Sequence, residues 1–203
     1  VGYGLRERAW FAMFYALLFI TIYISGRFEL KWMVSGVMAA ALIGVLANAL
    51  SSVLGRAVNR DQRYLMVDKV DKAMGGVKGK TIAMLGLSFK PNTDDLRDAP
   101  ALDMARTLTK RGAEIKVFDP VSMDLAKNIL KEVKYCKDEF DAVKDVDAAV
   151  FVTEWNEFRA LDLARLAQVM QTPAMADLRN IYSAEKAAEA GFTSYSAVGR
   201  RDL

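Results

Sequence analysis

The sequence lacks histidine altogether, and Cys136 is the only cysteine among its 203 residues. Without imidazole the chain offers no Ser-His or Cys-His nucleophile pair and no histidine metal ligand, which excludes most hydrolase mechanisms. A single thiol allows neither an internal disulfide nor a thiolate metal cluster, and it is compatible with a reducing cytosol. We therefore expect no metal site in this chain.

An excess of charge of one sign is also missing. Lys and Arg number 28 against 25 Asp and Glu, and the two signs are interspersed, which gives a net charge of +3. Because nucleic-acid binding requires a clustered basic face or stripe, we expect no nucleic-acid partner. Charge is scarce only in residues 1–55, whose charged side chains are Arg6, Glu7, Arg8, Arg27, Glu29 and Lys31.

Two long runs without charged residues fill that segment, residues 9–26 and 32–55. A helix needs about 20 mostly apolar residues to cross roughly 30 Å of hydrocarbon, so the second run is long enough and the first is marginal. Trp10, Tyr23 and Trp32 lie near the run ends, where aromatic rings favour the headgroup region. The pattern predicts that residues 1–55 form a helical hairpin that anchors the chain in the membrane through residues 9–55. A buried hairpin of a soluble domain is the alternative.

The basic residues around the two runs indicate an orientation. More of them lie outside the pair of runs than between them, namely Arg6, Arg8, Arg56, Arg60 and Arg63 against Arg27 and Lys31. Since cytoplasmic loops carry the excess of Lys and Arg, both ends of the hairpin are expected on the cytoplasmic side. The remainder of the chain is then a cytoplasmic domain anchored to the inner, cytoplasmic membrane.

Residues 56–76 are predicted to be a connecting helix, because they are polar with apolar residues at helical spacing and end in Gly75-Gly76. Residues 77–203 alternate short apolar runs with helical stretches, which is typical of an α/β fold, a Rossmann-like doubly wound parallel sheet. The expected strands are residues 81–87, 114–118, 133–136, 148–152, 174–176 and 193–196. The expected helices are residues 122–131, 139–143, 162–170 and 184–190, together with one that Asp98 caps, with Pro100 in its first turn and Gly112 after its end.

In such a sheet the ligand lies beyond the carboxyl ends of the strands, and the residues that follow the strands here are unusually polar. The sequence has no G-x-G-x-x-G turn for the phosphates of a dinucleotide. A bound phosphate would instead meet Lys90, Arg97 or Arg179, which follow the first and fifth strands. Lysine and arginine both suit diphosphate or carboxylate oxygens, because the lysine ammonium is a point charge and the arginine guanidinium is a planar, two-pronged donor. For each of them alone, a solvated surface charge is the alternative.

Four motifs, which follow one another along the chain, together resemble the sequence of a known protein family. They are GKTIAMLGLSFKPNTDDLRDAPA at residues 79–101, FDP at 118–120, TEWNEF at 153–158 and DLRN at 177–180. Together they resemble the C-terminal, UDP-binding domain of the UDP-glucose 6-dehydrogenase family. The run VNRDQR at residues 58–63 is similar to the end of that family's central helix, which links two Rossmann-like domains and forms the dimer interface. Residues 1–57 match nothing in the family.

The resemblance implies a function and a set of residues. Enzymes of this family use NAD to oxidise UDP-glucose to UDP-glucuronate. By the matching motif positions, Phe89 and Lys90 would contact the UDP-sugar, Arg179 would bind substrate, and Arg97 would reach the NAD side of the cleft. A homodimer through the connecting helix is implied as well. Related dehydrogenases act on GDP-mannose or UDP-amino sugars, so UDP-glucose is only the first choice of nucleotide sugar.

The sequence also departs from the family. Leu178 stands where the family usually has glycine, which puts the placement of Arg179 in question. Neither the glycine fingerprint of the NAD-binding domain nor the motif of the nucleophilic cysteine occurs in these residues, and Cys136 is expected to be a packed thiol. We therefore expect no catalytic residue here and no activity of this chain alone. The alternatives are a non-catalytic, membrane-tethered module that binds nucleotide sugars, and the product of a truncated or fused gene.

Overall fold

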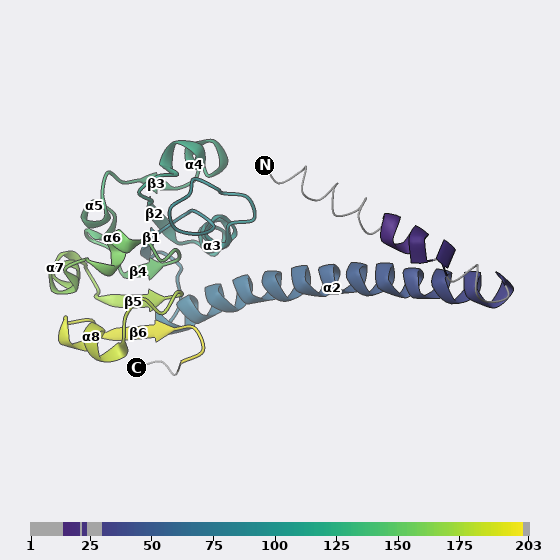
Figure 1. The fold of residues 1–203 in the computed structure, drawn as a ribbon. Coiled ribbons are helices and arrows are strands. Elements are labelled where there is room, and N and C mark those ends of the chain that lie inside the picture. The colour runs from purple at the N-terminus through teal and green to yellow at the C-terminus, as the bar shows by residue number, and fades with distance from the viewer. Residues whose placement is uncertain (1–13, 21, 24–29, 201–203) are drawn as a thin grey trace. The chain divides into compact units, whose positions relative to one another are not determined.

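The computed structural model describes residues 14–20, 22–23 and 30–200 (Figure 1). The chain forms two compact units, Val1–Val58 and Asn59–Leu203. The boundary between these units lies inside one long helix, α2 (Leu30–Ala73). The domain limits expected at residues 55 and 76 stay predictions.

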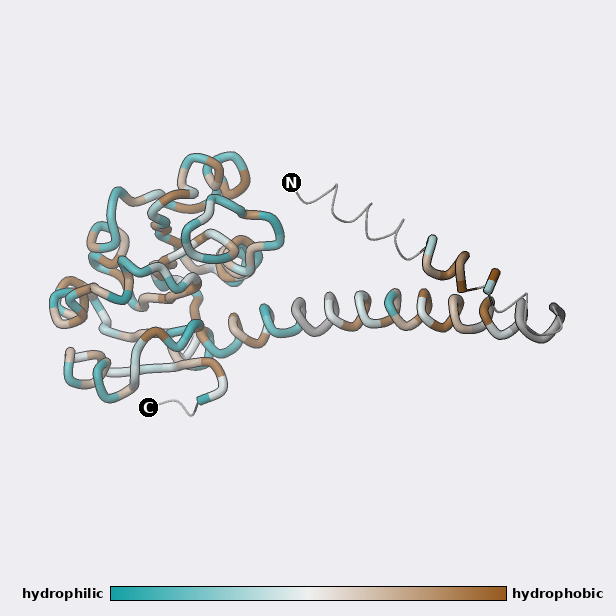
Figure 2. Tube along the Cα trace, viewed as in Figure 1, coloured by the Kyte–Doolittle hydropathy of each residue, from teal (hydrophilic) through white to brown (hydrophobic). Residues whose placement is uncertain are grey.

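In the first unit, the second apolar run is helical. The segment Gly36–Gly55 of α2 is long and apolar enough to cross a membrane, and none of it is buried. Its colours in Figure 2 are predominantly brown and pale. Residues 14–20 are also helical and exposed, but half of the first run, residues 9–26, lies outside the described residues. One apolar helix of this kind is weak support for a membrane span, since length and composition are its only basis.

The connecting helix is not a separate element, as residues 30–73 form one uninterrupted helix. The sequence changes from apolar to polar at Gly55, but a change of polarity does not break the backbone hydrogen bonds of a helix. A lone glycine in a helix interior costs only about 1 kcal/mol relative to alanine, so Gly55 is tolerated. The predicted end at Gly75-Gly76 is confirmed, because both glycines have positive φ and their N–H groups bond to Lys72 and Asp71 carbonyls.

The second unit contains the predicted parallel sheet. Its strands are β1 (Thr81–Leu85), β2 (Glu114–Phe118), β3 (Lys134–Tyr135), β4 (Ala148–Phe151), β5 (Ala174–Asp177) and β6 (Ser194–Ala197). They pair in the order β3-β2-β1-β4-β5-β6, and every pair is parallel. The order reverses between β1 and β4, which is the point where doubly wound sheets bind ligands. Rossmann-like architecture is therefore confirmed, and each strand lies at its predicted place within about two residues.

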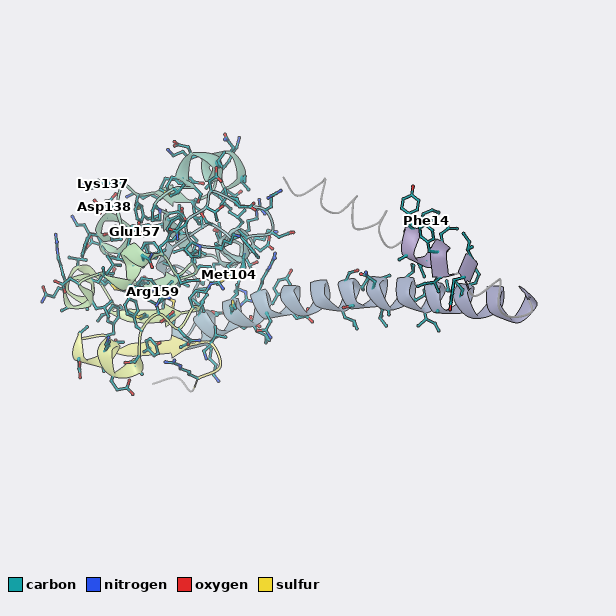
Figure 3. The ribbon with its side chains drawn as sticks, in the orientation of Figure 1. Phe14, Met104, Lys137, Asp138, Glu157 and Arg159 are labelled. Carbon is teal, nitrogen blue, oxygen red and sulfur yellow. The ribbon has the colours of Figure 1, made fainter. Side chains whose placement is uncertain are left out.

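The helices of the second unit are α3 (Pro100–Lys110), α4 (Met123–Ile129), α5 (Glu139–Val143), α6 (Asn156–Arg159), α7 (Leu163–Val169) and α8 (Ala184–Glu189). The sequence did not predict α6, a single turn that carries Glu157 and Arg159 (Figure 3). The prediction that Asp98 caps α3 is wrong. The N-cap is Ala99, because Pro100 opens the helix and the residue before proline is held in an extended conformation. Asp98 itself has a φ of 55°.

Helices cover both faces of the sheet and bury two apolar layers. One layer joins the end of α2, α3 and α4 to side chains such as Ile82, Met84 and Val117. The other joins α5, α6, α7 and α8 to the alternate side chains of the same strands, such as Leu85 and Phe151. This alternation follows from the period of two in a strand, and burial on both faces explains why the central strands β1 and β4 are almost entirely apolar.

Ion pairs fix the last turns of α2 along α3. Arg63 pairs with Asp103 near the start of α3, and it donates to the Asp98 carbonyl at 2.7 Å. Arg111, just beyond the end of α3, pairs with Asp68 at 2.5 Å and with Asp71 at 2.9 Å. Val67 and Val70 are buried between these pairs. The end of α2 is therefore part of the α/β unit.

Candidate functional site

All six strands are parallel, so their carboxyl ends meet at one edge of the sheet. The polar segments that follow β1, β2, β4 and β5 gather there. Their polar residues include four that are almost completely buried, namely Ser88, Asp119, Thr153 and Asp177. Buried polar side chains need hydrogen-bond partners, and these four bond to the loops around them. The edge is therefore a fixed polar surface that the sequence had indicated from strand positions.

Asp119, directly after β2, holds the loop that follows β1. Its carboxylate accepts hydrogen bonds from the Leu87 and Ser88 N–H groups at 2.7 and 3.0 Å, and from the Val121 and Ser122 N–H groups at 3.0 and 2.8 Å. Burial alone would raise the pKa of Asp119, but these backbone donors outweigh it and lower the pKa below its ordinary value. The ionised carboxylate is thus the form that fixes the loop.

Trp155, the tryptophan of the TEWNEF motif, belongs to the same cluster. Its indole N–H donates to Asp119 at 3.2 Å, and the side chain is only 2% exposed. The residue therefore packs inside the domain and does not line a ligand pocket. The FDP and TEWNEF motifs meet through this bond.

The crevice between β1 and β4 is closed by the chain itself. Gly86, at the end of β1, has a φ of 93°, and a Cβ placed there would lie 2.6 Å from the Thr153 Cβ. The Thr153 hydroxyl donates to the Ser88 carbonyl at 2.6 Å. Only glycine allows Thr153 to come this close to residue 86 and also adopts this backbone conformation readily. Thr153 therefore occupies the space beside the Gly86 Cα, where a dinucleotide fold of the usual type has its glycine-rich turn.

Arg179, after β5, is brought to the loop after β1. Its Nε donates to the Val152 carbonyl at 2.8 Å, and Nη2 donates to the Phe89 carbonyl at 3.3 Å. Glu154 lies on the same side, with Oε2 3.0 Å from Nε. The Arg179 side chain is 33% exposed, so the guanidinium is held by protein on one edge and remains accessible. Two of the predicted substrate residues, 90 positions apart, are therefore in direct contact.

Leu178 does not disturb this arrangement. Its side chain is 5% exposed and packs in the core, and its φ is not among the positive values of the described residues. The left-handed conformation occurs instead at Asn180, with a φ of 54°. Asp177 accepts from the Arg179 N–H at 3.0 Å and from the Tyr182 N–H at 2.8 Å, which shapes the turn. Glycine is therefore not required at position 178 for this placement of Arg179.

Phe89, Lys90 and Arg97 lie on the loop after β1. The Phe89 side chain is 45% exposed, and Lys90 is exposed as well. Arg97 is 89% exposed, and its Nε and Nη2 donate to Asp95 at 2.9 and 2.8 Å. These bonds lower the pKa of Asp95 to about 2, with a smaller contribution from the charge of Lys90. Both cations of the loop therefore lie near one carboxylate.

A hollow of about 590 Å³ flanks the Arg97 end of this loop. It is lined by residues 93–97 on one side and by Leu125, Asn128 and Ile129 of α4 on the other. Phe89, Lys90 and Arg179 do not line it. The hollow is therefore lined by the predicted cofactor residue Arg97 and not by the predicted substrate residues.

Cys136 is buried, with 4% exposure, and burial raises the pKa of its thiol. It is therefore a packed thiol, as expected, and unsuited to act as a nucleophile at neutral pH. Among the residues that the structure describes, no group of three or more His, Cys, Asp or Glu side chains could hold a metal ion.

Comparison of the sequence with models of known families identifies the family to which the chain belongs. The model of the UDP-glucose/GDP-mannose dehydrogenase family, UDP binding domain, matches residues 83–184, which is half of the chain. The chain belongs to this family. A second model, described as protein export membrane protein SecD/SecF, C-terminal, matches residues 1–62.

Curated relatives and solved structures agree with this membership. The UDP-glucose 6-dehydrogenase of Rhizobium meliloti is 45% identical over 147 residues, which are 72% of this chain and 33% of that protein. The UDP-glucose 6-dehydrogenase TuaD of Bacillus subtilis is 42% identical over 143 residues, 70% of this chain and 31% of the relative. A UDP-glucose dehydrogenase from Pyrobaculum islandicum matches with a TM-score of 0.60 and 29% identity, covering 79% of this chain and 35% of the other. The chain thus spans about a third of the length of these dehydrogenases.

Residues 30–200 of this family member do not fit the usual geometry of an NAD site. A dinucleotide site needs a glycine-rich turn that opens onto a helix N-terminus, and here Thr153 fills the corresponding turn at Gly86. Arg97 is the one candidate contact among the described residues, and its guanidinium is already bonded to Asp95. Any NAD chemistry therefore requires protein groups other than those described.

Proposed function

We propose that residues 77–203 bind the nucleotide part of a UDP-sugar, with UDP-glucose as the first choice, through Phe89, Lys90 and Arg179. The observation that supports this best is the placement of Arg179. Its guanidinium is fixed against the carbonyl of Phe89 and is one-third exposed at the carboxyl edge of the sheet. A planar cation held in this way suits the paired oxygens of a diphosphate.

The chain would then supply the UDP-binding part of an NAD-dependent UDP-glucose 6-dehydrogenase. The full reaction needs a hydride acceptor and, in this family, a thiolate nucleophile. The packed Cys136 and the filled turn at Gly86 support neither role. We therefore propose that the 203-residue chain forms no NADH from NAD and UDP-glucose unless another polypeptide provides those groups. Steady NADH production that Cys136→Ala abolishes is the result that would contradict this.

A non-catalytic, membrane-tethered module for nucleotide sugars is the second candidate. It is favoured by the unburied apolar segment Gly36–Gly55 and by the SecD/SecF match over residues 1–62. In this reading residues 9–55 form the membrane hairpin and the α/β unit faces the cytoplasm. The outer face of α2 beyond the membrane segment, where Tyr64 and Leu65 are exposed, would serve a homodimer. Expression of the full chain beside residues 56–203 tests the anchor, because only the full chain should require detergent for extraction.

The nucleotide-binding proposal is tested by calorimetry on the full chain in detergent micelles, with UDP and uridine as ligands. A diphosphate adds charge-assisted hydrogen bonds worth on the order of 1–3 kcal/mol each, so UDP should bind about ten-fold or more tightly than uridine. Lys90→Ala and Arg179→Ala should reduce this difference, and Arg97→Ala should reduce it less. Added salt should weaken UDP binding and leave uridine unchanged. Equal affinities for UDP and uridine would rule the proposal out.

A further inference from the structure

Glu154 has an unusual position for an acid beside a proposed anion site. Its Oε2 lies 3.0 Å from the Nε of Arg179, but Nε has a single hydrogen, and that hydrogen is donated to the Val152 carbonyl at 2.8 Å. Oε2 is buried and has no hydrogen-bond partner in the described part of the chain. Burying a carboxylate oxygen without a hydrogen bond is unfavourable, so the charge of Arg179 is what stabilises it.

The contacts of Arg179 are all on one edge of its guanidinium. Val152 and Glu154 face Nε, and the Phe89 carbonyl accepts from Nη2. No hydrogen bond from Nη1 is present among residues 30–200. The guanidinium is planar and rigid, so fixing the Nε edge also fixes the direction of the Nη1 edge.

We propose that Glu154 is a positioning residue, which holds the guanidinium of Arg179 so that its Nη1 edge faces the diphosphate of the bound nucleotide. This inference rests on the proposed binding of UDP by Arg179, and it adds a residue to that site. Glu154 does not itself touch the ligand. It reduces the conformational freedom that the arginine side chain would otherwise lose on binding.

Positioning and simple charge repulsion predict opposite results when the carboxylate is removed. A negative charge close to a diphosphate repels it, so on electrostatic grounds alone Glu154→Gln should tighten UDP binding. If positioning dominates, the same substitution frees Arg179 and weakens UDP binding about three- to ten-fold, the range expected for immobilising one long side chain. Uridine lacks the diphosphate, so its affinity should be unchanged in either case.

The matched control is Glu157→Gln. Glu157 is an exposed acid three positions along, on α6 (Figure 3), and its removal changes the net charge by the same amount without touching Arg179. A second variant, Glu154→Asp, keeps the charge but shortens the side chain, so it separates geometry from charge. Positioning predicts weaker UDP binding for Glu154→Asp as well, whereas repulsion predicts no change.

Calorimetry on the full chain in detergent micelles, with UDP and uridine as probes, decides between them. We expect Glu154→Gln and Glu154→Asp to weaken UDP three- to ten-fold with uridine unchanged, and Glu157→Gln to alter neither affinity by more than about two-fold. UDP binding as tight as in the unmodified chain, or tighter, for both Glu154 variants would overturn the inference. If Arg179→Ala weakens UDP while the Glu154 variants do not, only the positioning role fails. If Arg179→Ala has no effect either, the proposed UDP site fails with it.

Discussion

Replacing Asp119 by Asn should severely destabilise the α/β unit, although the side chain keeps its size. One carboxylate oxygen accepts from the Val121 and Ser122 N–H groups, and the other from the Leu87 and Ser88 N–H groups and the Trp155 indole. Asparagine has one acceptor oxygen, and its NH₂ group would face donors in either orientation. At least two N–H groups, those of Val121 and Ser122 or those of Leu87 and Ser88, then lose their partners.

The expected loss follows from that count. Each buried donor without a partner costs about 1–3 kcal/mol, so Asp119→Asn should lower the free energy of unfolding by roughly 2–6 kcal/mol. A domain of this kind has only about 5–15 kcal/mol of stability in total. The variant should therefore unfold at a much lower urea concentration, with the loop after β1 released from the sheet edge.

Urea denaturation of the full chain in micelles measures this effect. Fluorescence of the buried Trp155 reports on the site once Trp10 and Trp32 are replaced by Phe. Asp124→Asn is the control, because the Asp124 side chain on α4 is 93% exposed and forms a surface ion pair with Lys127, and such exposed pairs add little stability. Equal midpoints for Asp119→Asn and Asp124→Asn would refute the view that this carboxylate organises the edge.

Three further predictions concern the same edge. Because the folded pKa of Asp119 lies below its unfolded value of about 4, the stabilisation is present above that value, and the stability difference between the unmodified chain and Asp119→Asn should shrink as pH falls below about 4 in the same urea assay. Gly86→Ala should destabilise by about 1–3 kcal/mol more than Gly79→Ala, since both glycines have positive φ but only position 86 meets another atom within 4 Å; equal losses would contradict the close approach to Thr153. Carboxyl NMR should find the pKa of Asp95 at about 2 and show it rising in Arg97→Ala, and a pKa that does not respond would mean that the pair does not persist in solution.

The sequence predicted the sheet well because each strand carries its own signal. Residues 114–118 and 139–143 were located without error, since a short strand-like segment between turn residues, or a helix opened by a capping Asp such as Asp138, is a local pattern. Asp98 was misassigned because its side chain chemistry suggested a cap, while the conformational effect of Pro100 on the preceding Ala99 decided the helix start. The short helix α6 has only four residues and so no periodicity to detect.

The candidate site was predictable in part. Lys90, Arg97 and Arg179 follow strands, and that position marked them as candidate phosphate contacts, whereas Phe89 was named through the family resemblance. The pairing of Arg179 with Glu154 and with the Phe89 carbonyl depends on how three loops pack against one another, which no single-sequence pattern encodes. For the same reason the sequence could not predict that the hollow beside this loop is lined by Arg97 and not by Phe89, Lys90 or Arg179.

The order of the strands also bears on how the chain folds during synthesis. β1 lies in the middle of the sheet, and it pairs on one side with β2 and on the other with β4, whose partner residues are 66 positions later. At a synthesis rate of about 5–20 residues per second, the β4 side of β1 has no partner strand for roughly 3–13 s. An apolar strand with an unpaired edge can pair with other chains. Newly made chains should therefore depend most on chaperones in this interval, before β4 leaves the ribosome.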